Sequence, residues 1–239
     1  MGIFLRLKKL ILNLFFLFLC GIILLPMLWL IINSFKSNVE LFNDSLALPE
    51  VWQFSNYVKA WNLGLFDYFK NSVLVSFISI AAILILSALL TYGLTRFRVK
   101  GANFVLFIIL GGMALSEQVA LVPLYKMLQS LGLYDTYLAV ILPYVAFRIP
   151  FTVLLMRAYF LSIPKELEQA AIMDGYNSFQ IFLKIIVPIS KPVFASCAIV
   201  NLNFVWNEFL FANVFLERKE IMTIPIGLMT FKGDLKQDY

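Results

Sequence analysis

The chain alternates long apolar runs with short polar segments, and five of these runs are longer than a soluble core helix requires. A helix that crosses the hydrocarbon core of a bilayer needs about 20 apolar residues. Runs of this length occupy residues 10–32, 71–95, 102–128, 137–159 and 193–216. The pattern therefore predicts an all-α, polytopic transmembrane bundle with five spans.

The first apolar run follows Arg6, Lys8 and Lys9, as the core of a secretory signal would. However, it is too long for a signal core, and no small-x-small cleavage site follows it. We expect a retained helix. Residues 33–70 are too polar to lie within the membrane, and we expect short amphipathic pieces at the interface. Because no repeat or long Gly/Ser linker interrupts the chain, we treat it as one domain.

The composition supports a membrane protein and excludes several other classes. Of 239 residues, 62% are hydrophobic and 14% are charged, with a net charge of +5 and no histidine. The only cysteines, Cys20 and Cys197, lie inside apolar runs and form no disulfide or metal-ligand pattern. Without histidine the chain cannot form a Ser-His-Asp or Cys-His nucleophile pair. The chain also has no dense tract of Lys and Arg of the kind that a nucleic-acid-binding surface would need.

The basic residues between spans predict the orientation. Cytoplasmic loops are enriched in Lys and Arg. A cytoplasmic amino terminus places the following basic residues on the cytoplasmic side: Arg6, Lys8, Lys9, Arg96, Arg98, Lys100, Arg157, Lys165, Lys184 and Lys191.

Residues 162–192, between the fourth and fifth spans, predict two short helices joined by a hinge. Helix formers occupy residues 165–173, and Gly175 can supply the positive φ that ends a helix. A second helix over 178–187 should stop at Pro188. The small side chains of Ala170 and Ala171 would let another protein approach the first helix closely.

This segment resembles the cytoplasmic coupling loop of permease subunits in binding-protein-dependent ABC importers. The family has Glu-Ala-Ala followed by Asp-Gly, and here Gln169 replaces that Glu, with Glu168 just before it. The residues that match the pattern are Ala170, Ala171, Asp174, Gly175, Phe182, Ile185 and Pro188.

The resemblance implies that the loop docks on a separate ATPase. The residues expected to form that docking loop are Glu168, Gln169, Ala170, Ala171, Asp174, Gly175, Phe182 and Pro188. No Gly-x-x-x-x-Gly-Lys-Ser/Thr motif occurs, so ATP would be used by the partner, and we expect no cofactor on this chain.

The fourth and fifth spans resemble the carbohydrate branch of that family, in particular the second permeases of maltose-type and glycerol-phosphate-type importers. The similar segments are Leu142-Pro143-Tyr144, Arg148-Ile149-Pro150-Phe151, Met156-Arg157-Ala158-Tyr159-Phe160 and Trp206-Asn207-Glu208-Phe209. The resemblance implies a sugar as solute, a bacterial cell membrane, a second permease, two ATPase subunits and an extracellular solute-binding protein.

The family has six helices in this subunit, and the sequence predicts five. The last apolar stretch, 221–231, is short and contains Pro225 and Gly227, which we expect to break it. We therefore expect a fragment or truncated product that lacks the sixth helix.

Three predicted spans contain a charged residue at a depth where charge is costly. Glu117, Arg148 and Glu208 could line the solute pathway or a gate, or they could form a structural ion pair or contact the other permease. Asn203 and Asn207 share one helix face, with Glu208 beside them. That face could look into the pathway or form interhelical hydrogen bonds.

Three alternatives remain open. An ion-coupled secondary transporter could use Glu117 and Glu208, but it leaves the two-helix loop unexplained and predicts inverted repeats that are not visible. A membrane-embedded enzyme would need clustered catalytic groups. A permease of the same superfamily for another nutrient, such as amino acids or metals, would share the loop.

Overall fold

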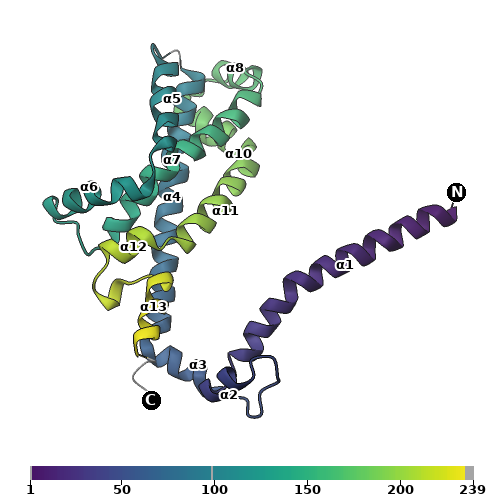
Figure 1. Ribbon diagram of the computed structural model, residues 1–239. Helices are drawn as coiled ribbons and strands as arrows, with labels where there is room; N and C mark the ends of the chain where they lie inside the picture. The colour runs from purple at the N-terminus through teal and green to yellow at the C-terminus, as the bar shows by residue number, and fades with distance from the viewer. Residues whose placement is uncertain (1, 98, 235–239) are drawn as a thin grey trace. The chain divides into compact units, whose positions relative to one another are not determined.

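The computed structural model describes residues 2–97 and 99–234, and all regular structure within them is helical (Figure 1). The chain divides into two compact units, Met1–Gly64 and Leu65–Tyr239, where the sequence suggested a single domain. Gly64 adopts a positive φ of 99° at this division. Arg98, Lys236 and Asp238 lie outside the described residues.

The first unit contains one long helix and a short folded segment after it. Its helices are α1 (Gly2–Asn33), α2 (Asn38–Asn43), α3 (Ser55–Ala60) and the π-helical turn η1 (Trp61–Leu65). The Phe35 ring lies 5.4 Å from Trp52 and 5.1 Å from Tyr57, centroid to centroid. The buried Lys36 donates from Nζ to the carbonyl of Asp44 at 3.0 Å. Short helices are therefore present after the first span, as predicted, and aromatic contacts join the segments around them.

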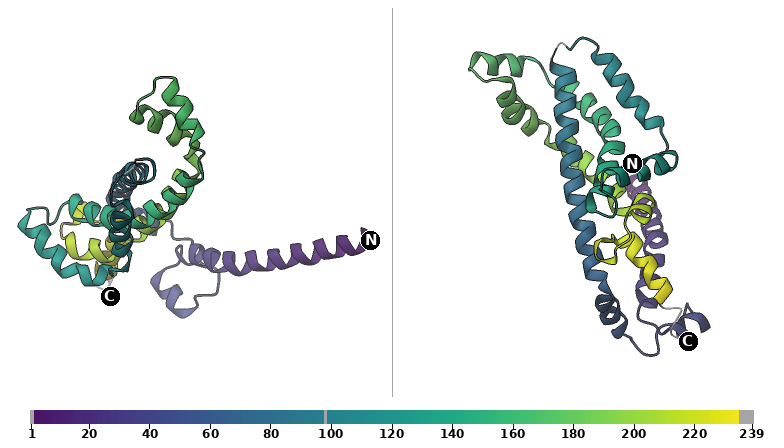
Figure 2. Two further views of the ribbon diagram at one scale, coloured as in Figure 1. Left: turned by 90° about the horizontal axis from the view of Figure 1, so that it is seen from above. Right: turned by 90° about the vertical axis from the view of Figure 1, so that its left-hand side faces the viewer.

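The second unit is built around two long helices. α4 (Phe66–Arg96) and α7 (Tyr137–Ser162) pack along one another, and α11 (Lys191–Asn207) packs against both (Figures 1 and 2). Several small polar residues of α4 are buried within this unit. They are Ser72, Ser76, Ser79, Ser87 and Thr91. Such short side chains allow helix backbones to approach closely in a bilayer, where the hydrophobic effect does not drive helix association.

Shorter helices cover the two ends of this pair. The remaining elements are α5 (Ala102–Gly111), η2 (Gly112–Ala114), α6 (Glu117–Ser130), α8 (Glu166–Met173), α9 (Ser178–Ile181), η3 (Phe182–Ile186), α10 (Val187–Ile189), α12 (Leu210–Phe215), η4 (Lys219–Ile221) and α13 (Ile224–Asp234). α8 to α10 lie at the carboxyl-terminal end of α4, and α13 lies near its start (Figure 1).

Among the described residues, three helices are long and apolar enough to cross a membrane, or up to five if each bent pair is one span. Two predicted spans are not continuous helices. The run 102–128 breaks at Leu115 and Ser116, whose backbones are extended, and the two sides differ in direction by 100°. The run 193–216 breaks at Glu208, which is also extended.

The prediction that Pro225 and Gly227 break the last apolar stretch is wrong. α13 runs from Ile224 through both residues, because Pro225 occupies the first turn, where a missing N–H is tolerated. Gly227 fits against the buried Tyr68 of α4, and a Cβ there would lie 2.2 Å from the ring. Asn71 of α4 also donates hydrogen bonds to the carbonyls of Glu220 and Met222, and the Ser72 hydroxyl accepts one from the backbone N–H of Ile224.

Candidate functional site

The two-helix loop, residues 166–189, begins as predicted. α8 ends at Met173, and Gly175, two residues later, has the positive φ of 85° expected from the sequence. α9 then starts with a capping box, in which the side chains of Asn177 and Gln180 each accept the other's backbone N–H at 2.9 Å. Helix end and helix start are thus separated by only a few residues, which fixes the turn between them.

The second half of the loop departs from the prediction at Pro188. The helical path continues through Pro188 to Ile189, where the sequence suggested a stop. Pro188 has no N–H to bond the carbonyl four residues earlier, and the preceding turn, Phe182–Ile186, is π-helical. A wider turn of this kind accommodates a proline without ending the helix.

The loop has an inner and an outer face, and the expected docking residues divide between them. Ala171 and Phe182 are buried at 3% and 6% exposure, and Glu168 also turns inward. Ala171 therefore packs inside the chain and does not form the bare face expected from the sequence. The remaining expected docking residues are exposed, and they are Gln169, Ala170, Asp174, Gly175 and Pro188.

The inner face belongs to a hydrophobic cluster shared with α4, α7 and α11, which we name the loop-side core. Its residues are Ala88, Tyr92, Met156, Phe160, Ile163, Ala171, Ile181, Phe182, Ile186, Val193 and Cys197. Because this core contains residues of α8, α9 and η3, the loop is packed onto the long helices along its length.

Three polar side chains attach the loop to the long helices, and sequence reasoning assigned none of them this role. Tyr92 donates its hydroxyl to the carbonyl of Ser178 at 3.1 Å, and Tyr159 donates to that of Ile189 at 3.0 Å. Arg96 forms an ion pair with Glu168 at 2.6 Å. From the sequence, Arg96 could be recognised only as a basic residue at the end of a predicted span. Such a residue indicates the orientation of the chain in the membrane, but it does not identify an ion-pair partner.

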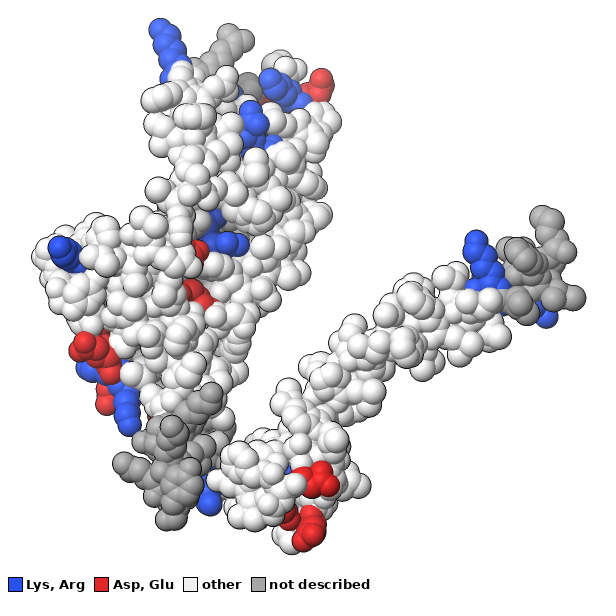
Figure 3. All heavy atoms as spheres, in the orientation of Figure 1, with Lys and Arg blue, Asp and Glu red and all other residues white. Residues whose placement is uncertain are grey.

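A second group of candidate residues lies within the apolar helices. In Figure 3, basic and acidic atoms lie next to one another midway along the second unit, apart from the charged atoms at its ends. Glu208 is buried at 7% exposure and accepts hydrogen bonds from the backbone N–H of Phe211 and Ala212. The Tyr144 hydroxyl donates to the same carboxylate. Glu208 therefore caps the start of α12 and joins it to α7.

Arg148 is held by neutral partners. Its Nε donates to Oδ1 of Asn201 at 3.2 Å, and its guanidinium lies 4.1 Å from the Phe204 ring centroid. No carboxylate of the described residues comes within ion-pair distance of it, although Glu117 lies close enough to interact electrostatically. Aromatic faces stabilise a guanidinium in this way, most strongly where water is excluded.

The two asparagines predicted to share a face of α11 are both exposed. Asn207 donates from Nδ2 to the carbonyl of Asn203 at 2.7 Å, which leaves both side-chain oxygens and the Asn203 amide available. The buried amide on this helix is Asn201, which donates to the Thr152 hydroxyl at 3.0 Å. The structure thus brings Glu117, Arg148 and Glu208 near one another and leaves Asn203 and Asn207 on the surface.

At the other end of the second unit, Asp135 joins the connection between α6 and α7 to the connection between α12 and η4. Its carboxylate accepts the backbone N–H of Glu217 and Arg218 at 2.8 and 3.1 Å and the Arg218 Nε at 2.7 Å. Partial burial acts to raise the pKa of this carboxyl, but the hydrogen bonds and the guanidinium charge hold that pKa below its usual value. Burial and the contact with Glu217 raise the pKa of the neighbouring Tyr134.

No group of three or more His, Cys, Asp or Glu side chains in the described part of the chain could hold a metal ion. The candidate site consists of the two-helix loop with its exposed outer face and a polar patch among apolar helices (Figure 3).

Comparison with known proteins places these features in context. The whole chain, residues 1–239, matches the family model described as the binding-protein-dependent transport system inner membrane component. It is 48% identical over 214 residues to the probable ABC transporter permease protein YurM of Bacillus subtilis (strain 168), covering 90% of this chain and 71% of YurM.

Two further relatives have named solutes. The diacetylchitobiose uptake system permease protein NgcG of Streptomyces coelicolor is 37% identical over 79% of this chain and 63% of its own length. The arabinooligosaccharides transport system permease protein AraQ of Bacillus subtilis is 34% identical over 97% of this chain and 83% of its own length.

A solved structure has the same fold. A chain of a bacterial ABC transporter involved in the import of the acidic polysaccharide alginate superposes with a TM-score of 0.75 and 26% identity. The match covers 96% of this chain and 82% of that chain.

Proposed function

This chain belongs to the family of binding-protein-dependent transport system inner membrane components and is a permease subunit of a sugar ABC importer, and we propose that its two-helix loop couples it to the ATPase. The observation that supports this role is the division of the loop into two faces. One face is packed into the loop-side core, and the other leaves Gln169, Ala170 and Asp174 exposed.

The outer face is suited to a protein partner. Met173 is 88% exposed and Ile172 is 59% exposed, so apolar surface lies beside the small side chain of Ala170. Exposed apolar side chains next to polar ones are typical of interaction sites. The partners we propose are two ATPase subunits, a second permease and an extracellular solute-binding protein. In this arrangement the loop and the amino terminus are cytoplasmic, and the chain itself performs no covalent chemistry.

The solute we propose is an oligosaccharide. The named relatives transport diacetylchitobiose and arabinooligosaccharides, both chains of sugar units. Sugars are bound largely through hydrogen bonds to their hydroxyls, and the exposed amides of Asn203 and Asn207, with the nearby guanidinium of Arg148, offer donors and acceptors for them. We propose that these residues and Glu117 line the pathway, while Glu208 supports it by holding α12 to α7.

Co-purification of the tagged chain with its ATPase tests the docking role. The test variant is Ala170→Arg, which places a long charged side chain on the outer face. Ala47→Arg is the matched control, since Ala47 is also exposed but lies in the first unit. Ala171→Arg is unsuitable, because Ala171 is buried and the change would disrupt the loop-side core.

We expect Ala170→Arg to remove the ATPase from the purified complex and Ala47→Arg to retain it, with both variants inserted in the membrane. Full recovery of the ATPase with Ala170→Arg would show that the outer face is not the contact. Uptake of labelled arabinooligosaccharide, compared with labelled amino acids, separates the sugar proposal from a permease for another nutrient.

A further inference from the structure

One guanidinium connects three helices where the loop meets the membrane helices. Arg96 is the last residue of α4, and its Nη2 donates to the carbonyls of Phe160 and Ile163 at 2.9 and 3.2 Å. Those carbonyls lie at the end of α7, where the Phe160 carbonyl also accepts the backbone N–H of Ile163 at 3.2 Å. On its other side, Nε of Arg96 lies 2.6 Å from Oε1 of Glu168 in α8. Arg96 therefore holds α4, α7 and α8 to one another.

The ion pair is enclosed. The side chains of Arg96 and Glu168 are only 4% and 14% exposed, and neither of the two paired atoms forms a hydrogen bond with a described residue, so their attraction is electrostatic. A charge left in such a place without its counter-ion is strongly unfavourable. Because separation of the pair is unfavourable, α8 resists moving away from the end of α4.

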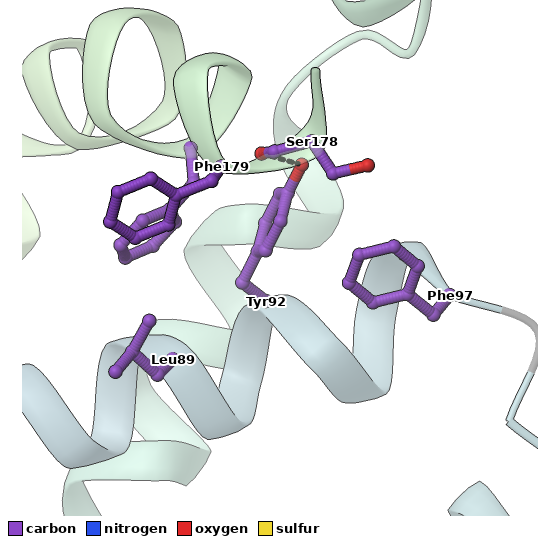
Figure 4. Close-up of a pocket in the computed structure, with 6 residues that line it drawn as sticks. Leu89, Tyr92, Phe97, Ser178 and Phe179 are labelled. Atoms are coloured by element: carbon purple, nitrogen blue, oxygen red, sulfur yellow. Dashed lines mark hydrogen bonds between the residues drawn. The ribbon is translucent and has the colours of Figure 1, made fainter.

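A second polar contact acts beside the first. Tyr92 precedes Arg96 by one helical turn, so both side chains lie on the same face of α4. Figure 4 shows Tyr92 pointing from α4 to the start of α9, where its hydroxyl meets the carbonyl of Ser178 between the rings of Phe97 and Phe179. The Tyr92 ring also lies 5.0 Å from that of Phe182. An open pocket of ≈ 260 Å³ lies beside these rings.

The two kinds of contact differ in what they can transmit. Apolar contacts in the loop-side core favour burial but are not directional. A guanidinium is a planar group with a fixed fork of N–H donors, and it specifies both distance and orientation. The Arg96 fork donates to two carbonyls at the end of α7, and its charge pairs with Glu168 of α8, so one side chain links the docking helix to both long helices.

We propose that Arg96 is a positioning residue that, through Glu168, transmits displacement of the docking loop to α4 and α7. This inference rests on the proposed docking of the ATPase on the outer face of α8. Without the ion pair, α8 moves while the ends of α4 and α7 lag behind, and ATP hydrolysis is no longer converted into solute movement. In this arrangement Gln169, Ala170 and Asp174 contact the ATPase, and Arg96 transmits the resulting displacement of α8 to the long helices.

The test measures ATP hydrolysed per solute imported by the complete importer in proteoliposomes. The variants are Arg96→Gln, Glu168→Gln and Arg96→Lys. Arg157→Gln is the control, because Arg157 lies on α7 and forms no ion pair in the described part of the chain. We expect Arg96→Gln and Glu168→Gln to retain the bound ATPase and to raise the ATP consumed per solute about fivefold or more.

Arg96→Lys separates coupling from mere stability. It keeps the charge but loses the fork, so its ratio should fall between those of wild type and Arg96→Gln. An unchanged ratio in Arg96→Gln with the ATPase bound would overturn the inference, as would a ratio in Arg96→Lys that exceeds that of Arg96→Gln.

A measurement on the chain alone distinguishes this inference from the docking proposal. In a background without Cys20 and Cys197, spin labels at Met173 and Val99 report the distance between α8 and the segment after α4. We expect a broader distance distribution in Arg96→Gln than in wild type, and an unchanged distribution would overturn the positioning role. Absence of the ATPase from the wild-type complex would instead overturn the docking proposal, and the transmission role with it.

Discussion

Glu208 illustrates how a single charged side chain within an apolar run can have a structural role. The sequence placed it among candidate pathway residues, since charge at membrane depth is costly and usually functional. In the structure its carboxylate accepts hydrogen bonds from the Tyr144 hydroxyl and from the backbone N–H of Phe211 and Ala212. A carboxylate that is held by three donors of its own chain has a structural role. Only the break between α11 and α12 shows why a carboxylate is needed there.

We predict that Glu208→Ala lowers the free energy of unfolding by about 2–4 kcal/mol, because buried donors lose their acceptor. The neighbouring exposed residue provides a matched control, and Asn207→Ala should change stability by less than about 0.5 kcal/mol. The midpoint of an SDS titration in mixed micelles measures both. Equal midpoints for the two variants would contradict the capping role.

Asp135 makes stability at one end of the second unit dependent on pH. Its pKa is lowered in the folded chain, so its contribution is fully present above the unfolded value of about 4. That contribution is lost as the pH falls through the lowered folded pKa. We predict that Asp135→Asn is less stable than wild type at neutral pH and that the difference narrows below about pH 4. Thermal unfolding in detergent across that pH range measures the difference in stability between the two proteins. A difference that does not change with pH would show that ionisation of Asp135 does not contribute to stability.

The individual helices were easier to predict than their interruptions. Apolar length predicted α1, α4 and α7, because a bilayer span requires a nearly uncharged run. The breaks at Leu115 and Ser116 and at Glu208 lie inside equally apolar runs. Helix breaks there depend on contacts with other helices, such as the capping of α12 by Glu208, and these contacts are far apart in the sequence.

α13 offers a test of packing between helices. Gly227→Ala places a Cβ 2.2 Å from the buried Tyr68 ring, so α13 must shift away from α4. We predict a loss of stability of about 1–3 kcal/mol, typical of an overpacked contact.

Gly93→Ala is the control for that prediction, because a Cβ at this α4 position meets no atom within 4 Å. Replacing a helical glycine by alanine in open space should stabilise the chain by about 0.5–1 kcal/mol. Opposite signs for the two variants in the same SDS titration would confirm the close contact. Stabilisation by both would show that α13 does not pack on α4 as described.

The topology of the whole chain is predicted from its loops. In a background without Cys20 and Cys197, a cysteine at Met173 should react with a membrane-impermeant maleimide only in inverted vesicles. A cysteine at Phe42 should react only from the extracellular side, in intact cells whose cell envelope lets the reagent reach the cell membrane. Both positions are exposed, at 88% and 87%, so neither is protected by the chain itself. Labelling of both from the same side would refute the cytoplasmic amino terminus.

Sequence alone was sufficient for the class of molecule, because hydrophobic length, loop charge and a local motif are properties of consecutive residues. It predicted the all-α membrane fold, the family and the helix–Gly175–helix loop. The tertiary structure decided which side chains of that loop face inward, since burial depends on contacts between distant segments. The buried position of Ala171 and the pairing of Arg96 with Glu168 arise only when α4, α7 and α8 pack together.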